Sequence, residues 1–449
     1  MTQPEALEIL KSGYNVFLTG SAGSGKTFLL NQYIKYLQDN KIKTGVTAST
    51  GLAATHLDGR TIHSWCGIGI DERLNAKELK KIINDEKIWE RIKYARVLII
   101  DEISMLSASR LDLASYVCQA IKQDARPFGG LQVVLCGDFF QLPPVAGLGQ
   151  DKRFVFDSNT WAELDLKICY LDEQYRHEDK RFFEVLNNIR ANRKIKEATE
   201  ILLERLNTPI EADINPTKLF THNTDVDSYN NLEMTKLPGQ PTYHQMRSEG
   251  LPNLVNRLKE SCLAPEKLEL RVGAVVMFVR NNFDKGYVNG TIGKVISFTN
   301  SDNFPIIETI KGQTIIAVPE AWRISDDEKA LATVWQVPLR LAWAITIHKS
   351  QGMSLDCAEM DLSRTFEYGM GYVALSRVRS LAGIKLLGLN KMALKIDKSM
   401  IEADNKLIAK SKSDLSLFKK IKAKERLKRQ QDFLNPAPGS DFSVATTLV

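Results

Sequence analysis

Short apolar runs alternate with helical segments over the first 165 residues. Four of these runs have the composition of short β-strands and end in Gly, Ser, Thr or acidic residues, namely residues 15–20, 44–50, 97–102 and 132–138. Uninterrupted apolar strands are typical of parallel sheets that are buried on both faces. The pattern therefore predicts an α/β domain over residues 1–165, with its functional site at the carboxyl ends of the strands.

A second group of apolar runs predicts another α/β domain. These runs are residues 218–222, 340–346, 358–362 and 383–389, and they place the second domain at 166–270 and 335–395. Short β-branched runs punctuated by Gly and Asn predict a small antiparallel β-barrel inserted at 271–334. We expect a small excursion at about 52–90 on the first domain, and a basic helical segment with a flexible tail over 396–449.

The composition is that of a soluble globular protein, with 449 residues, 43% hydrophobic and 25% charged. The net charge of +6 equals that of residues 419–429, which hold seven basic residues and one acidic residue. This segment is open to three interpretations: a solvated helix face, an extra nucleic-acid contact or a membrane-surface segment. We expect no membrane span and no secretory signal, and a cytoplasmic or nucleoid-associated protein.

The six cysteines are scattered singly and form no CxxC pair. This distribution predicts buried, reduced thiols and no structural metal. His63 and Cys66 are the nearest approach to a pair of metal ligands, but no second pair completes them.

Residues 20–27, GSAGSGKT, match the phosphate-binding pattern GxxxxGK[ST] between an apolar strand and a helix. Glycines in such a loop let backbone N–H groups surround phosphate oxygens, while the lysine reaches the β and γ phosphates. The Thr27 hydroxyl is a candidate magnesium ligand. The predicted nucleotide-binding residues are Gly20, Ser21, Ala22, Gly23, Ser24, Gly25, Lys26 and Thr27.

Two acidic residues end the apolar run at 97–102. Asp101 is suited to hold magnesium, and Glu102 to polarise an attacking water. Gln141 follows the next predicted strand, where its amide could contact the γ-phosphate; a simple capped turn is the alternative. Together with the phosphate-binding loop, the two acids predict a nucleoside triphosphate hydrolase.

Six ordered segments carry a family resemblance: residues 47–65, 101–105, 128–145, 171–176, 345–356 and 371–380. This set resembles the petite integration frequency (PIF) family of superfamily-one DNA helicases, which is related to the RecD-type enzymes. The resemblance covers most of the chain except its last 50 residues. It implies two RecA-like motor domains that bind ATP and magnesium, bind single-stranded DNA and move 5′ to 3′.

The resemblance also implies roles for individual residues. Gln3 would read adenine, Tyr175 would stack on the base, and Gly352 would lie close to the nucleotide. Arg176 and Arg377 would reach the γ-phosphate from the second motor domain. A solvated glutamine, a core tyrosine and interface salt bridges are the structural alternatives for these positions.

The candidate DNA contacts lie in both predicted domains. Thr47, Ser49 and Thr50 end a predicted strand with hydroxyl groups suited to phosphate oxygens. His63 matches the family's DNA-binding motif in the first domain, and Thr346, His348 and Lys349 match the motif in the second. Purely structural roles remain the alternative for each of them.

Several partners and two rival functions remain open. The expected substrates are single-stranded and forked DNA, with G-quadruplex and RNA–DNA hybrid as further candidates, in DNA repair, recombination or telomere maintenance. Residues 430–434, QQDFL, faintly resemble a peptide that docks on the replication clamp. We expect a monomer. The rival functions are a small-molecule P-loop kinase or nucleotide switch, and a DNA-stimulated translocase that remodels complexes without separating strands.

Overall fold

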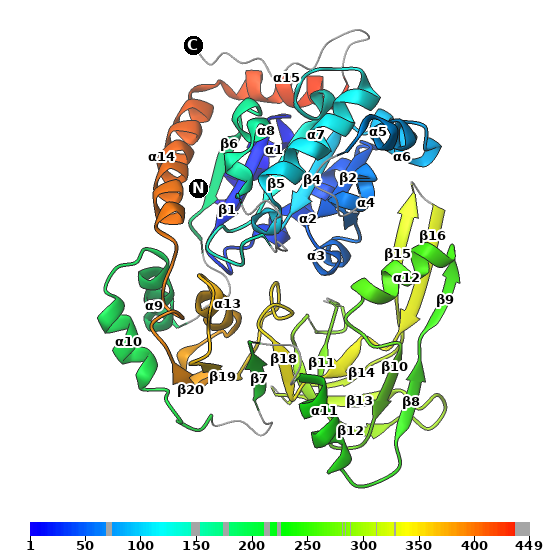
Figure 1. Cartoon of the computed structure of the whole chain (residues 1–449), viewed down its shortest axis with the longest axis vertical. Helices are drawn as coiled ribbons and strands as arrows, with labels where there is room; N and C mark the ends of the chain where they lie inside the picture. The colour runs from blue at the N-terminus through cyan, green and yellow to red at the C-terminus, as the bar shows by residue number, and fades with distance from the viewer. Residues whose placement is uncertain are drawn as a thin grey trace. The chain divides into compact units, whose positions relative to one another are not determined.

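The structure is a computed structural model in two compact units. Unit 1 comprises Met1–Tyr175 and Glu402–Val449, and unit 2 comprises Arg176–Ile401. Figure 1 labels the elements of both units. The described residues are 1–68, 74–144, 153–173, 179–210, 216–221, 226–280, 282, 284–287, 289–310, 312–326 and 329–435.

Unit 1 is built on a six-stranded sheet in which every pairing is parallel. The strand order is β3-β2-β4-β5-β1-β6, with β3 and β6 at the two edges of the sheet. The strands are β1 (Val16–Gly20), β2 (Thr44–Ala48), β3 (Arg60–Thr61), β4 (Val97–Asp101), β5 (Gln132–Cys136) and β6 (Lys167–Leu171). The predicted α/β class is confirmed, but the boundary predicted at residue 165 falls before β6, which belongs to this sheet.

Helices cover the sheet, and β1, β4 and β5 are therefore buried along their whole length. The first eight helices are α1 (Gln3–Lys11), α2 (Lys26–Asp39), α3 (Gly51–His56), α4 (Ile62–Cys66), α5 (Ala76–Ile83), α6 (Glu86–Tyr94), α7 (Ala108–Lys122) and α8 (Asn159–Glu163). One core cluster joins α1 and α2 to β1, through residues such as Ile9, Leu18 and Leu29. The sheet and these helices hold the strand ends in fixed positions.

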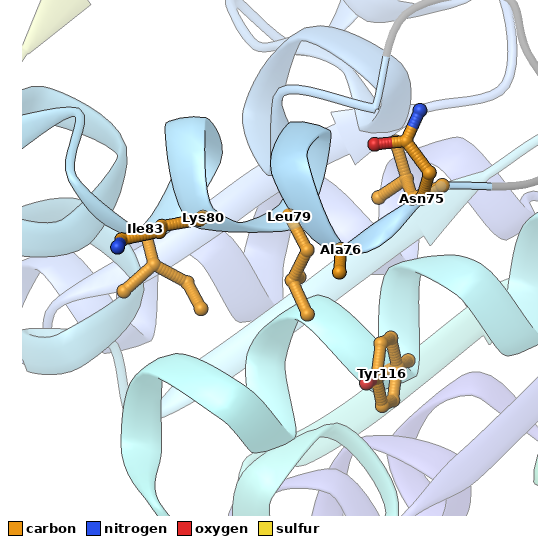
Figure 2. A pocket seen from close by; sticks show the side chains of 7 residues that line it. Asn75, Ala76, Leu79, Lys80, Ile83 and Tyr116 are labelled. Atoms are coloured by element: carbon orange, nitrogen blue, oxygen red, sulfur yellow. The ribbon is translucent and has the colours of Figure 1, made fainter.

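Helices α3 to α6, together with the short strand β3, occupy the predicted excursion. A cavity of about 270 Å³ lies where α5 faces α7, and its lining combines aliphatic side chains with Lys80 and Tyr116. Figure 2 shows Leu79 of α5 directed toward the helix that carries Tyr116, while Lys80 extends to one side. None of the residues of the phosphate-binding loop lines this cavity.

The C-terminal segment folds onto unit 1. It forms α14 (Lys398–Lys420) and α15 (Ala423–Leu434), and the expected tail at 436–449 lies outside the described residues. Phe418 of α14 and Phe433 of α15 belong to the same core cluster as α1 and β1. Within residues 430–434, Gln431 and Asp432 are exposed but Phe433 is only 3% exposed, so clamp binding through this peptide would require the Phe433 ring to leave the core.

Unit 2 contains a second parallel sheet, with strand order β18-β7-β19-β20. Its strands are β7 (Thr217–Phe220), β18 (Ala344–Thr346), β19 (Ala358–Leu362) and β20 (Ile384–Leu389). Its helices are α9 (Lys180–Arg190), α10 (Ile195–Leu203), α11 (Val226–Thr235) and α13 (Met370–Arg377). The second α/β domain predicted from the apolar runs is therefore confirmed.

Antiparallel strands separate β7 from β18 along the chain. They form sheets of five strands (β14-β13-β12-β11-β17), three strands (β15-β16-β9) and two strands (β10-β8). Their bounds are β8 (Thr242–Gln245), β9 (Arg247–Gly250), β10 (Lys267–Leu270), β11 (Val275–Phe278), β12 (Ile292–Phe298), β13 (Pro305–Thr309), β14 (Thr314–Ile316), β15 (Glu320–Asp326), β16 (Lys329–Gln336) and β17 (Leu339–Leu341), with α12 (Pro252–Ser261). The insertion is thus antiparallel as predicted, but it extends beyond 271–334 on both sides.

All six cysteines are buried and none forms a disulfide. The prediction of buried thiols is confirmed for each of them. Among the described residues, no helix combines the length and the apolar character needed to cross a bilayer.

Candidate nucleotide and DNA site

The phosphate-binding loop connects the end of β1 to the start of α2. Gly23 and Gly25 adopt left-handed backbone angles, with φ of 86° and 83°, which favour glycine because it has no Cβ. The Lys26 ammonium donates to the carbonyl oxygens of Gly20 (2.8 Å) and Ser21 (3.0 Å). Thr27 lies exposed in the first turn of α2. The loop thereby places a cation beside the helix N-terminus, an arrangement suited to phosphate.

Asp101 lies at the carboxyl end of β4, where its carboxylate interacts electrostatically with the Lys26 ammonium. The residue is 7% exposed, and its carboxylate accepts from the Glu102 backbone N–H (2.8 Å) and from the Cys136 thiol. Burial raises the pKa of Asp101, while these hydrogen bonds and the charge of Lys26 offset part of the rise. A carboxylate oxygen beside a phosphate loop is a ligand that magnesium prefers.

Glu102 adopts a left-handed backbone conformation, with φ 51° and ψ 45°. This conformation is uncommon for a residue other than glycine. The Ser49 hydroxyl donates to the Glu102 carbonyl oxygen (2.7 Å), and the Ser49 backbone N–H donates to the Asp101 carbonyl oxygen (3.0 Å). The end of β2 therefore fixes the backbone turn that presents the Glu102 side chain.

Gln141 lies in the turn that follows β5. Its backbone N–H donates to the Asp138 carbonyl oxygen (3.0 Å), and its side-chain oxygen is buried without a hydrogen-bond partner among the described residues. Phe139 anchors this turn by packing against Phe17 (5.2 Å between ring centroids) and Trp161 (5.9 Å). Because buried amide oxygens are normally paired, Gln141 has a polar group available for a ligand.

Gln3 brings α1 to the phosphate-binding loop. Its side-chain amide lies 3.5 Å from the Ser24 carbonyl oxygen and 3.4 Å from that of Gly25. The residue is 8% exposed. The side chain is thus packed beside the loop rather than solvated, in contrast to the structural alternative considered from the sequence.

The candidate DNA contacts of unit 1 differ in accessibility. Thr47 is fully buried and donates its hydroxyl to the Ile99 carbonyl oxygen (2.6 Å), which contradicts a DNA contact through its side chain. The Thr50 hydroxyl accepts from the Ala53 N–H (3.2 Å) at the start of α3. Burial, together with the charge of Arg110, lowers the pKa of His63 to about 4, so its imidazole is neutral at pH 7.

In unit 2, a tight turn follows β18. Thr346 is 1% exposed and its hydroxyl accepts from the Lys349 N–H (3.2 Å), which makes it a cap of the turn and contradicts a direct DNA contact. His348 and Lys349 are half-buried, and Gly352 has a left-handed φ of 79°. Thr346 thereby orders the backbone that carries His348 and Lys349.

Arg377 ends α13 and is 1% exposed. Its guanidinium donates to the Val373 carbonyl oxygen (3.0 Å) and to the Ser376 hydroxyl (2.8 Å). These bonds fix its side chain against its own helix. Tyr175 and Arg176 lie outside the described residues.

Sequence reasoning missed the Cys136 thiol, which bonds to Asp101. The signal was present, because Cys136 ends the strand beside β4 and the carboxyl ends of parallel strands meet at one edge. Reading all six cysteines as inert core residues concealed it.

Comparisons with known proteins give the chain its family. Residues 5–202 match the family model described as PIF1-like helicase, and residues 253–298 match DNA helicase Pif1, 2B domain. The chain is 42% identical to the ATP-dependent DNA helicase Pif1 of a Psychrobacter species, over 93% of this chain and 71% of that protein. The chain belongs to the PIF1-like helicase family.

Solved structures of family members agree with this assignment. The chain is similar to Bacteroides Pif1 in complex with ADP-AlF4, with 32% identity, a TM-score of 0.77 and coverage of 91% of this chain and 96% of that chain. It is also similar to Bacteroides Pif1 bound to ssDNA, with 31% identity, a TM-score of 0.62 and coverage of 92% and 97%. The chain spans 63% of the length of the PIF1 helicase of Xenopus laevis.

Proposed function

We propose that this protein is an ATP-dependent DNA helicase that binds single-stranded DNA and separates duplex strands with 5′-to-3′ polarity. The observation that carries the proposal is the convergence of Lys26, Asp101 and Glu102 at one sheet edge in a member of a helicase family. The Psychrobacter relative is named as such a helicase, and Bacteroides Pif1 has been solved with ADP-AlF4 and with ssDNA.

In this proposal the loop binds the phosphates of ATP. Lys26 neutralises charge on the β and γ phosphates, and Glu102 orients the attacking water. In this proposal the Gln141 side-chain N–H donates to a γ-phosphate oxygen, so the residue distinguishes ATP from ADP. Phe139 anchors the turn that carries Gln141 by packing against Phe17. Loss of the contact between Gln141 and the γ-phosphate would therefore be transmitted through this turn.

Magnesium fits the residues that the loop and β4 supply. The Thr27 hydroxyl and the Asp101 carboxylate are hard oxygen ligands, and magnesium commonly takes only one or two protein ligands beside phosphates and water. Bound there, it would neutralise charge on the β and γ phosphates.

Coupling to motion would depend on residues of unit 2. Arg377 and Arg176 contribute positive charge to the γ-phosphate from the second motor domain, Tyr175 stacks on the base beside Gln3, and Gly352 allows the backbone to approach the nucleotide. Arginines of this kind are worth roughly 10³ to 10⁵ in rate. Hydrolysis then changes the affinity of one motor domain for the other and for DNA.

We assign DNA contact to Thr50 and His63 in unit 1 and to His348 and Lys349 in unit 2. Ser49 is only 9% exposed and its hydroxyl already donates to the Glu102 carbonyl oxygen, so we assign it a role in ordering the turn. His63 would act as a neutral hydrogen-bonding group, whereas Lys349 would contact phosphate through its charge. Such contacts give affinity without reading sequence. We further propose forked DNA as substrate, with G-quadruplex and RNA–DNA hybrid as candidates, and a monomeric enzyme.

One unwinding experiment tests the proposal. The full chain, with ATP and magnesium, is given duplexes that carry either a 5′ or a 3′ single-stranded tail, and Lys26→Ala serves as the inactive control. We expect the 5′-tailed duplex alone to be unwound. ATPase activity stimulated by single-stranded DNA without unwinding would identify a translocase instead, and DNA-independent hydrolysis would reject the DNA-motor reading.

A further inference from the structure

Helix α14 covers the free edge of the unit 1 sheet. Strand β6 is the last strand in the order, and its outer N–H groups belong to Ile168 and Tyr170. Asp414 accepts from the Ile168 N–H (2.8 Å), and the Ser411 hydroxyl accepts from the Tyr170 N–H (3.2 Å). Both side chains are buried, with exposures of 6% and 4%. Side chains three positions apart on one helix thus replace the missing neighbouring strand.

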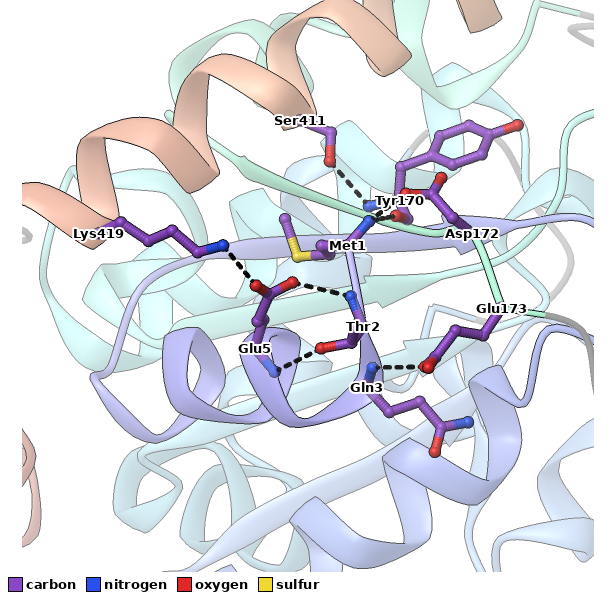
Figure 3. A network of polar contacts seen from close by, with 9 residues as sticks. All are labelled: Met1, Thr2, Gln3, Glu5, Tyr170, Asp172, Glu173, Ser411 and Lys419. Carbon is purple, nitrogen blue, oxygen red and sulfur yellow. Dashed lines mark hydrogen bonds and ion pairs between the residues drawn. The ribbon is translucent and has the colours of Figure 1, made fainter.

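The same helix reaches the first turn of α1. The Lys419 ammonium lies 2.6 Å from the Glu5 carboxylate, which also accepts from the Thr2 N–H (2.9 Å). Glu5 and Thr2 form a capping box, because the Glu5 N–H donates back to the Thr2 hydroxyl (3.4 Å). The hydrogen bond with Lys419 is the main cause that lowers the pKa of Glu5. Figure 3 shows this chain of contacts running from Lys419 to the backbone beside Gln3.

Polar contacts add to apolar packing at this junction, because Ala6, Ile9 and Leu10 of α1 share a core cluster with Phe418 of α14. A cavity of about 310 Å³ lies between α14, β6 and the start of α1, and Ile408 and Leu415 line its α14 side. The Lys419–Glu5 pair is one of the contacts that orient the first turn of α1, together with the hydrogen bonds from the Met1 ammonium to the Tyr170 carbonyl oxygen and to Asp172. Gln3 belongs to that turn, and its backbone N–H donates to Glu173 (3.2 Å) at the end of β6.

Helix α15 holds the other end of α1. The Arg429 guanidinium donates to the Ser12 carbonyl oxygen (2.8 Å) and lies 3.8 Å from the centroid of the Tyr14 ring. The Gln430 amide donates to the Glu8 carboxylate (2.9 Å). Two basic residues of the segment 419–429 are therefore used for intramolecular contacts with α1 or its C-terminal end.

We propose that α14 and α15 form a clasp on α1, and that Lys419 and Glu5 are positioning residues that set the base specificity of the nucleotide site through Gln3. The inference deepens the proposed function, because it requires Gln3 to read adenine. A glutamine amide can donate to and accept from adenine in a paired arrangement, whereas the corresponding edge of guanine presents two acceptors. Tilting α1 would therefore weaken the binding of ATP more than the binding of GTP. The loop would still bind the phosphates of both nucleotides.

The test compares ATP and GTP hydrolysis by the full chain with magnesium and single-stranded DNA. Gln3→Ala should abolish the preference for ATP in kcat/KM. Lys419→Ala should lower the ratio of kcat/KM for ATP to kcat/KM for GTP about two- to fivefold, which is the range expected from loss of an exposed ion pair. The change should appear as a higher KM for ATP, with kcat unchanged. Lys419→Arg should restore the ratio, and Lys420→Ala, which removes the same charge one residue away, should leave it unchanged.

The outcomes separate the two proposals. If Gln3→Ala leaves the ratio at the wild-type value, Gln3 does not read adenine and the clasp proposal falls with it. If Gln3→Ala lowers the ratio but Lys419→Ala does not, the role of Gln3 stands and the clasp proposal is overturned. Equal losses for ATP and GTP in Lys419→Ala would also overturn it, because they would indicate only a structural role. In the Gln3→Ala background, Lys419→Ala should cause no further loss of the ratio.

Discussion

Removal of the Phe433 ring should destabilise unit 1 strongly, even though the residue lies near the C-terminal end of α15. The ring is 3% exposed and packs in the core cluster that includes Tyr14 and Phe418. The Arg96 guanidinium lies 5.3 Å from the ring centroid and donates to the Phe433 carbonyl oxygen. Truncation of a buried phenylalanine to alanine costs about 3 to 5 kcal/mol. For a unit of this size, that loss lowers the melting temperature by roughly 6 to 20 °C.

Differential scanning calorimetry of the full chain measures this effect. Leu427→Ala provides the matched control, because Leu427 lies on the same helix and is 58% exposed; its melting temperature should stay within about 1 °C of the wild-type value. A wild-type melting temperature for Phe433→Ala would refute the packing of α15. It would also revive the clamp-binding interpretation of residues 430–434, which requires an accessible phenylalanine.

Three further predictions follow from single contacts. Asp414→Ala leaves the buried Ile168 N–H without an acceptor and should lower the free energy of unfolding, measured with urea, by about 1 to 3 kcal/mol. Ser416 is exposed on the same helix, so Ser416→Ala should leave the free energy of unfolding unchanged. Because the folded-state pKa of His63 is about 4 against an ordinary 6.5, the unfolded chain binds more protons between these values. Stability should therefore fall by up to about 3 kcal/mol as the pH drops from 6.5 towards 4, and unfolding of His63→Gln should show a smaller loss. Lys349→Ala should weaken binding to all single-stranded sequences alike and reduce the salt slope by about 1 in fluorescence anisotropy titrations, and a sequence-selective loss would refute a phosphate contact.

The local elements of the nucleotide site were predictable because they depend on adjacent residues. An apolar strand, a glycine loop and a helix occur in direct succession over residues 15–39, and the structure has β1 and α2 at those positions. Asp101 follows from the same logic, since it ends an apolar strand. The closeness of Gln3 to the loop was expected from the family resemblance alone.

Contacts between distant segments were not predictable from local pattern. Residues 341–345 form one uninterrupted apolar run. Nevertheless β17 pairs with antiparallel β11 and β18 pairs with parallel β7, so strands from this run belong to two different sheets. The Thr47 hydroxyl suggested a phosphate contact and Thr346 matched the family's DNA-binding motif, but each hydroxyl satisfies a backbone group instead. Similarly, the basic segment 419–429 gave no sign that Lys419 and Arg429 contact α1 or its C-terminal end.

The discontinuous construction of unit 1 bears on how the chain folds during synthesis. Ser411 and Asp414, which complete the edge of β6, are translated only after the 226 residues of unit 2, Arg176–Ile401. At typical elongation rates this delay is roughly 10 to 45 seconds. Throughout that interval the nascent N-terminal sheet exposes an open strand edge, so ribosome-associated chaperones have a defined segment to shield until α14 arrives.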